Sequence, residues 1–229
     1  MATHTIQIPI IADTYTNYNS RDTSYGNSTI IKAGGPELSP ASYNSHYHAY
    51  FKWDKTVPQL PPLKKIIETN LCLYNLSEQS SSDRLYAISE KDFTEQSTWN
   101  QINSDTIHYA NVAFYYGGFP VNQYIKLKAK DHYLDYWRGL AHITAENTND
   151  DSKVLEFASR ESSNPPYLEI IYEDVPPDAP TPIDPIGVYK DSSQTIRFQW
   201  TYNSSVGGTQ KAFDLQWSPD QSTWTTINP

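Results

Sequence analysis

The chain has 229 residues, a formal net charge of −9 at pH 7 and an aromatic content of 14%, with 18 tyrosines and 6 tryptophans. The negative charge argues against a nucleic-acid partner, which requires a basic surface, and it disfavours an electrostatic hold on acidic polymers. A composition poor in aliphatic residues and rich in Tyr, Thr and Ser suits half-buried strands better than helices. We therefore predict an all-β protein of one large or two modest domains.

The N-terminal segment has no positively charged region and no apolar run long enough for a signal peptide or a membrane span. Alternation begins at once, with Ile6, Ile8 and Ile10 on one face of an expected strand. Two origins fit this start: a signal peptide replaced by Met1 for expression, or export by assembly into a particle. In both cases we expect an extracytoplasmic protein without membrane insertion.

Further segments alternate with period two, which is typical of strands. One helix is expected at residues 131–138, because Leu134 and Trp137 fall three apart and Gly139 follows where a C-terminal cap belongs. A single short helix among many strands is compatible with a jelly-roll topology. Cys72 is the single cysteine, which excludes an intrachain disulfide and predicts a small buried thiol. The positions expected to share faces of strands are Ala49, Phe51, Trp53, Leu71, Leu73, Leu85, Ala87, Ile125, Leu127 and Ala129.

Two more strands are expected before residue 174. Leu155 and Phe157 alternate with polar neighbours, residues 162–166 have turn composition, and Leu168 and Ile170 alternate again before a proline-rich tail. We interpret this arrangement as a closing hairpin that ends the first domain.

Several stretches carry distinctive motifs in a fixed order. They are residues 12–15 (Ala-Asp-Thr-Tyr), 24–28 (Ser-Tyr-Gly-Asn-Ser), 49–54 (Ala-Tyr-Phe-Lys-Trp-Asp), 91–100 (Lys-Asp-Phe-Thr-Glu-Gln-Ser-Thr-Trp-Asn) and 159–172, which runs from Ser-Arg-Glu to Tyr-Leu-Glu-Ile-Ile-Tyr. Together they resemble the DNRLRE domain family, bacterial and archaeal β-sandwiches that include carbohydrate-binding modules. Ser24 and Phe93 stand where Asn and Trp are common in that family. The resemblance spans about residues 12–172 and implies a jelly-roll-like β-sandwich that binds surfaces, with no catalytic residues to carry over.

Beyond residue 174 the composition changes. Residues 175–181 are rich in proline and predict a semi-rigid linker between a domain at 1–174 and a second at 182–229. An early proline, a strand that ends in Trp200 and a Ser-Pro-Asp-Gln-Ser turn resemble the first half of a fibronectin type III domain. Such immunoglobulin-like sandwiches need about 100 residues. We therefore predict a partial sandwich whose apolar side chains need cover from further chain or a neighbouring subunit, namely Phe198, Trp200, Leu215 and Trp217.

Candidate metal ligands are few. His46 and His48 lie on one face if their segment is a strand, a spacing that could hold a transition metal, although surface histidines in a polar loop are the simpler interpretation. Asp13, Asp22 and Asp54 could supply oxygen ligands to a structural Ca²⁺, with strand-end or turn aspartates as the alternative. We expect no other cofactor.

The sequence contains no Gly-x-Ser-x-Gly elbow, no phosphate-binding loop and no His-Glu-x-x-His helix. Glycosidase chemistry depends on the separation of two carboxyl groups, and no such pair can be recognised among Glu95, Glu156, Glu161 and Glu169. We therefore predict that the protein is not an enzyme. Arg160 lies next to Glu161, which predicts an ion pair that fixes the turn rather than a clamp on a ligand.

Aromatic residues gather in two expected loops, residues 42–48 and 109–120. Aromatic faces stack on the apolar faces of sugar rings, and Asn, His and Tyr groups supply hydrogen bonds that orient them. We therefore predict ligand contacts at Tyr43, Tyr47, Tyr115, Tyr116 and Phe119. The alternative is that these rings close the ends of the core, which is the role we predict for Trp53, Trp99 and Trp137.

Two functions fit these expectations. The first is a non-catalytic structural or receptor-contacting component of a phage tail or phage-like particle, with a cell-surface glycan or other particle subunits as partners in a homo- or hetero-oligomeric assembly. The second is a carbohydrate-binding module of a secreted enzyme or cell-surface adhesin. Neither function involves a nucleic-acid partner.

Overall fold

The computed structural model describes residues 2–39, 42–54, 64–78, 83–88, 92–102, 113–116, 118, 120–129, 140–147, 153–184, 186, 193, 195, 197–204 and 209–227. The side chains of residues 36–39, 42–45, 83–88, 113–116 and 140–147 are not part of that description. The chain divides into a large unit, residues 3–59 and 66–172, and a small unit, residues 1–2, 60–65 and 173–229. The helix predicted at residues 131–138 lies outside the described residues.

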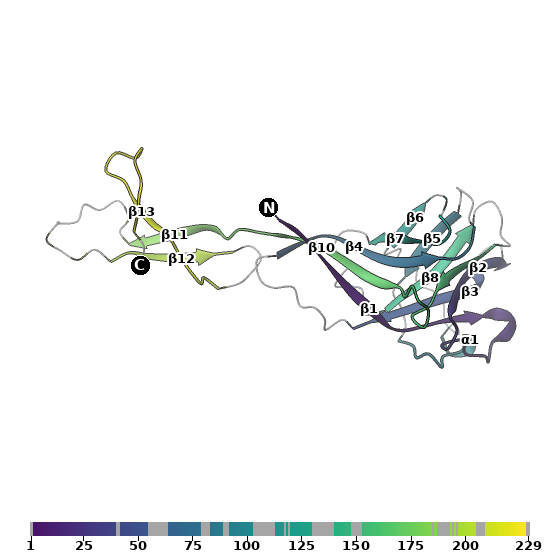
Figure 1. The fold of residues 1–229 in the computed structure, drawn as a ribbon. Helices are drawn as coiled ribbons and strands as arrows, with labels where there is room; N and C mark the ends of the chain where they lie inside the picture. The colour runs from purple at the N-terminus through teal and green to yellow at the C-terminus, as the bar shows by residue number, and fades with distance from the viewer. Residues whose placement is uncertain are drawn as a thin grey trace. The chain divides into compact units, whose positions relative to one another are not determined.

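Strands make up most of the described structure (Figure 1), which confirms the all-β prediction. The helical segments of the described residues are short: η1 (Tyr18–Ser20), a 3₁₀ turn, and α1 (Trp99–Ile102). The strands of the closed sheet are β1 (Thr3–Asn17), β2 (Ile30–Ser39), β3 (Ser42–Trp53), β4 (Lys64–Asn75), β5 (Asp83–Ile88), β6 (Ala113–Tyr116), β7 (Gln123–Ala129), β8 (Leu140–Asn147), β9 (Val154–Ala158) and β10 (Tyr167–Asp174). They are followed by β11 (Asp178–Asp184), β12 (Gln199–Asn203), β13 (Leu215–Trp217) and β14 (Thr225–Ile227).

The first ten strands form one sheet that closes on itself. Its strand order is β1-β10-β4-β7-β6-β5-β8-β3-β2-β9, and additional pairings join β1 to β3 and β4 to β9. Strands β1, β10, β4, β9, β2 and β3 therefore complete a barrel-like ring. Closure removes free sheet edges, which are sites of unwanted pairing between proteins.

The closing hairpin predicted for β9 and β10 is wrong, although both strands exist. β9 pairs with β2 from Ile30↔Ala158 to Gly34↔Val154 and meets β4 at one position, whereas β10 lies between β1 and β4. Pro165 and Pro166, just before β10, have no N–H to donate to a hairpin ladder. Residues 159–166 are therefore a loop between strands that are not paired with each other, called the β9–β10 loop below.

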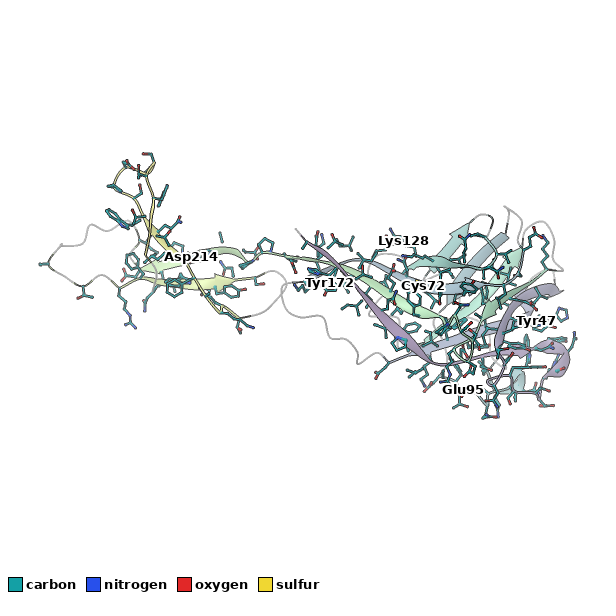
Figure 2. The ribbon with its side chains drawn as sticks, viewed as in Figure 1. Tyr47, Cys72, Glu95, Lys128, Tyr172 and Asp214 are labelled. Carbon is teal, nitrogen blue, oxygen red and sulfur yellow. The ribbon has the colours of Figure 1, made fainter. Side chains whose placement is uncertain are left out.

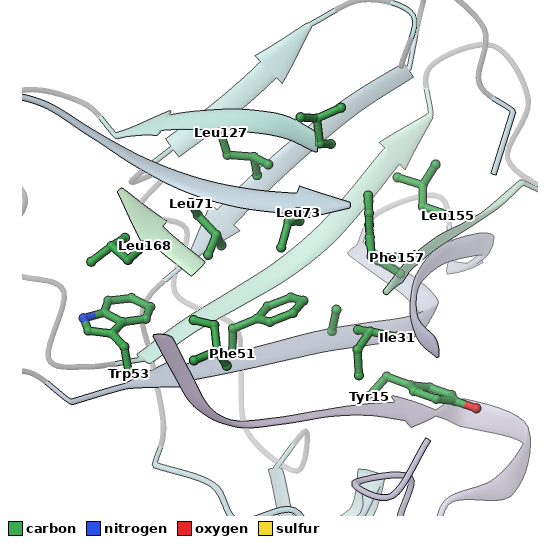
Figure 3. Packing of buried hydrophobic residues seen from close by; sticks show 14 of the residues in the cluster. Tyr15, Ile31, Phe51, Trp53, Leu71, Leu73, Leu127, Leu155, Phe157 and Leu168 are labelled. Carbon is green, nitrogen blue, oxygen red and sulfur yellow. The ribbon is translucent and has the colours of Figure 1, made fainter. Parts of the chain in front are cut away.

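The core confirms the alternation read from the sequence. Leu71, Leu73 and Leu127 are fully buried, and Figure 3 shows them facing Phe51 across the interior. Leu155, Phe157, Leu168 and Ile170 are buried as well, so β9 and β10 contribute their predicted faces to the same cluster together with Ile31, Trp53 and Ile125.

Strand β1 changes its pattern midway. Ile8 and Ile10 are buried as predicted, but the register against β3 shifts between Ile10 and Ala12. Such an irregularity bends a strand and redirects its side chains. After it, Asp13 and Tyr15 are buried along with the threonines between and after them.

A second, smaller cluster forms where residues 92–102 pack against β3. Tyr50, Phe93 and Ile102 are its buried members. Trp99 at the start of α1 is buried against His48, with ring centroids 4.9 Å apart, and meets Tyr18 edge-to-face at 5.4 Å. The core prediction is thus confirmed for Trp53 and Trp99, while Trp137 lies outside the described residues.

The described residues of the small unit form two separate two-stranded antiparallel sheets, β11–β12 and β13–β14. Strand β11 begins at Asp178, so it occupies part of the segment predicted as a linker at 175–181. Prolines are tolerated there because β11 has one described partner, and an edge strand does not need every N–H.

Trp99→Ala should lower the free energy of unfolding by roughly 3–5 kcal/mol, because it removes a buried ring and leaves a cavity between Tyr18 and His48. The matched control is Trp224→Ala, which removes a ring that is 57% exposed and should cost under about 1 kcal/mol. Urea unfolding of both variants measures the difference, and equal losses would contradict the burial of Trp99.

Candidate binding site

The β9–β10 loop is ordered by its own serine side chains. The Ser159 hydroxyl donates to Glu161 Oε2 at 3.0 Å and accepts from the backbone N–H of Glu161 at 3.2 Å. The Ser162 hydroxyl donates to the Ser159 carbonyl at 2.7 Å and accepts from the N–H of Asn164 at 3.2 Å. These local bonds satisfy polar groups of the loop, including those of the buried Ser159.

Asp13 anchors this loop to β1. Its side chain is fully buried, and Oδ2 accepts a hydrogen bond from the backbone N–H of Arg160 at 2.8 Å. Burial raises the pKa of Asp13 from its ordinary value of 3.8 to about 7, and Glu161 adds to the rise, while the Arg160 N–H opposes it. The protonated form can donate to Glu161, so the two carboxyl groups can lie side by side without two full charges.

Arg160 also holds the loop in place, through ion pairs. Its guanidinium pairs with Glu161 at 2.9 Å (Nε to Oε1), as the sequence predicted, and its NH2 group also pairs with Glu95. Glu95 belongs to the segment before α1, and Figure 2 labels it in the part of the large unit where Figure 1 places α1. A side chain at Gly26 would overlap the backbone of Glu95, so glycine permits this close approach.

The motif residues of four distant stretches therefore form one polar cluster. Asp13 comes from the first motif, Gly26 from the second, Glu95 from the fourth and Ser159 to Glu161 from the last. Their contacts are with one another, which assigns them a structural role. The ion pair predicted to fix the turn exists and extends to Glu95.

Next to this cluster lies a groove of about 650 Å³, which we call the candidate groove. Gln7 and Pro9 line it from β1, Tyr124 from β7, and Arg160, Pro165 and Tyr167 from the β9–β10 loop and the start of β10. Its volume falls within the range of about 300–1,000 Å³ that is usual for small-ligand sites.

Tyr124 has a fixed orientation in the groove. Its hydroxyl donates to the Pro165 carbonyl at 3.0 Å, and its ring meets Tyr74 and Tyr167 edge-to-face, each at a centroid distance of 5.2 Å. The residue nevertheless remains 37% exposed. A ring held in this way loses little conformational entropy when a ligand stacks on it.

The strands beside the groove carry a paired set of charges. Lys126 binds Glu169 at 2.6 Å, and Lys128 binds Glu68 at 2.8 Å. Figure 2 labels Cys72 and Lys128, which lie on the paired strands β4 and β7. Cys72 is the predicted buried thiol, and burial raises its pKa to about 11.

Tyr47 is the predicted ligand contact whose side chain is described, and it does not line the candidate groove. Tyr43 and Tyr47 lie in β3 and Tyr115 and Tyr116 in β6, so these four positions of the two expected aromatic loops are in strands, in keeping with the strand propensity of aromatic residues. Tyr47 is half-buried against Tyr15 at 6.0 Å. The side chains of Tyr43, Tyr115 and Tyr116 and the whole of Phe119 lie outside the description, so their contact with a ligand stays a prediction.

The metal predictions find no support within the described residues, where no three His, Cys, Asp or Glu side chains gather into a site for an ion. Asp22 accepts instead from Asn100 at 2.8 Å. His46 and His48 belong to β3, not to a surface loop, and His48 is fully buried.

A comparison of the chain with protein-family models and with curated proteins found no match. Within the described residues, no helix has the length and apolar character needed to cross a bilayer.

The small unit has a hollow of its own, about 550 Å³ in volume, that Phe198, Trp200, Phe213 and Leu215 line together with prolines of β11. Trp200 and Phe213 pack at 4.8 Å. Phe198, Phe213, Trp217 and Trp224 are each more than 40% exposed. Phe198 and Phe213 both line the hollow, so part of this exposed apolar surface is gathered in one place.

Asp13→Asn should remove one cause of the pH dependence of the free energy of unfolding. The pKa of Asp13 is near 7 in the folded protein and 3.8 ordinarily, so the folded state keeps the carboxyl proton to a higher pH than the unfolded state does. The stability of the wild type therefore falls between pH 4 and pH 7 relative to that of the variant. The relative change is on the order of 4 kcal/mol. Urea unfolding at pH 4, 5.5 and 7.5 measures it, with the exposed Asp22→Asn as control. A stability difference between variant and wild type that is the same at every pH would refute the buried, protonated Asp13.

Proposed function

We propose that the protein is a non-catalytic binding component that makes contact with a cell-surface glycan through the candidate groove. The observation that carries this proposal is the exposed Tyr124 ring, held by Pro165, Tyr74 and Tyr167 beside the polar side chain of Gln7. Aromatic faces bind the apolar faces of sugars, and adjacent polar groups orient them.

We place this component in a phage tail or phage-like particle, where it serves as a structural or receptor-contacting subunit outside the cytoplasm. The exposed rings of the small unit favour this setting, because a particle subunit can cover them. A carbohydrate-binding module of a secreted enzyme or adhesin is the second candidate, and the same groove favours it.

The finer features of the fold belong to the same proposal. The closed sheet would be a jelly-roll-like sandwich of the DNRLRE type, and the small unit would be part of a fibronectin type III-like domain. The supporting observations are the motif residues that meet in the polar cluster and the tryptophans on β12 and β13.

A glycan array probed with the full chain tests the binding proposal. We expect a restricted set of glycans to bind, and Tyr124→Ala to weaken that binding roughly tenfold or more in protein whose melting curve shows it to be folded at the assay temperature. Tyr115→Ala with Tyr116→Ala is the parallel variant for the sites predicted from sequence. Loss of binding in that double variant but not in Tyr124→Ala would move the site to β6, and no glycan binding at all would refute the proposal.

A further inference from the structure

We infer that the candidate groove selects glycans without charge, in preference to uronic-acid or other anionic polymers. This inference rests on the proposed function and specifies the class of ligand. It follows from how the charges in and around the groove are paired.

Arg160 is the one charged residue among the described residues that line the groove. Its guanidinium already pairs with Glu161 and Glu95, and its side chain is 35% exposed. Two carboxylates therefore surround one cation, and the local excess is negative. A ligand carboxylate that approached Arg160 would compete with both partners and be repelled by them.

The neighbouring cations are similarly occupied. Lys126 pairs with Glu169, whose side chain is 8% exposed, and Lys128 pairs with Glu68. Asn70 also donates to Glu169 at 3.0 Å, which fixes that carboxylate below the surface. Withdrawing Lys126 to meet an anionic ligand would leave Glu169 buried without its cation, which is a costly arrangement.

The remaining polar groups are neutral. Gln7 offers an amide, and the phenols of Tyr124 and Tyr167 both have a raised pKa, chiefly because of burial, so they stay un-ionised at physiological pH. Neutral donors and acceptors beside a fixed aromatic face match sugar hydroxyls and the C–H face of a pyranose. Affinity from such contacts depends little on salt, whereas an ionic grip weakens as salt screens it.

The test measures binding of the full chain to three neutral polymers (galactomannan, arabinoxylan and β-1,3-glucan) and two acidic ones (alginate and polygalacturonate). We expect binding to at least one neutral polymer, with less than about a twofold change in affinity between 50 and 500 mM NaCl. Tyr124→Ala should reduce that affinity roughly tenfold or more. Gln7→Ala, an exposed change on β1, should also reduce it, and so provides a second measure if Tyr124→Ala alters folding. Trp224→Ala should have no effect.

The outcomes separate the inference from the proposed function. Binding to an acidic polymer that needs Tyr124 or Gln7 and weakens steeply with salt would overturn the neutral specificity and leave glycan binding at this groove standing. The absence of any binding that depends on Tyr124 or Gln7 would overturn both.

Discussion

The large unit depends on how the β9–β10 loop is held. The strands on either side of this loop, β9 and β10, are not paired with each other, so no hairpin ladder positions the loop. Three groups from distant parts of the chain hold it instead: Asp13 accepts from the Arg160 N–H, Glu95 pairs with the Arg160 guanidinium, and the carbonyl of Thr29 accepts from the Ser159 N–H at 3.1 Å. Because these partners come from β1, from the segment before α1 and from the turn before β2, the loop joins three parts of the unit.

The same loop forms one wall of the candidate groove. Pro165 accepts the Tyr124 hydroxyl, and Tyr167 packs against the Tyr124 ring, so the groove's aromatic face is fixed from the loop side. Arg160 reaches the groove but is occupied by Glu95 and Glu161. In the function we propose, structure and specificity are linked, because the ion pairs that position the loop also occupy the cation that an anionic ligand would need.

Alternation along the chain was enough to predict most strands and their inward faces, including Phe51, Leu71, Leu127 and Phe157. Alternation reports one strand at a time and says nothing about its neighbours. It therefore suggested that β9 pairs with β10, and it could not show that Asp13 lies under a loop 147 residues later.

The groove escaped prediction for a related reason. The face predicted for Ile125 and Leu127 leaves Tyr124 on the opposite face of its strand, but its neighbours Tyr74 and Tyr167 come from β4 and β10, which meet only through a non-sequential strand order. The outward aromatic positions on three separate strands were the available signal. The ligand contacts were predicted instead in the two stretches richest in aromatic residues, where β3 and β6 lie.

A double-mutant cycle between Arg160 and Glu95 tests most directly whether the polar cluster holds the loop. The variants are Arg160→Gln, Glu95→Gln and the double variant, and the measured quantity is the free energy of unfolding in urea. Both side chains are only partly buried, at 35% and 25% exposure, yet they belong to a network. The account predicts a coupling energy of about 1 kcal/mol or more. A coupling energy near zero, as for many isolated surface pairs, would contradict it.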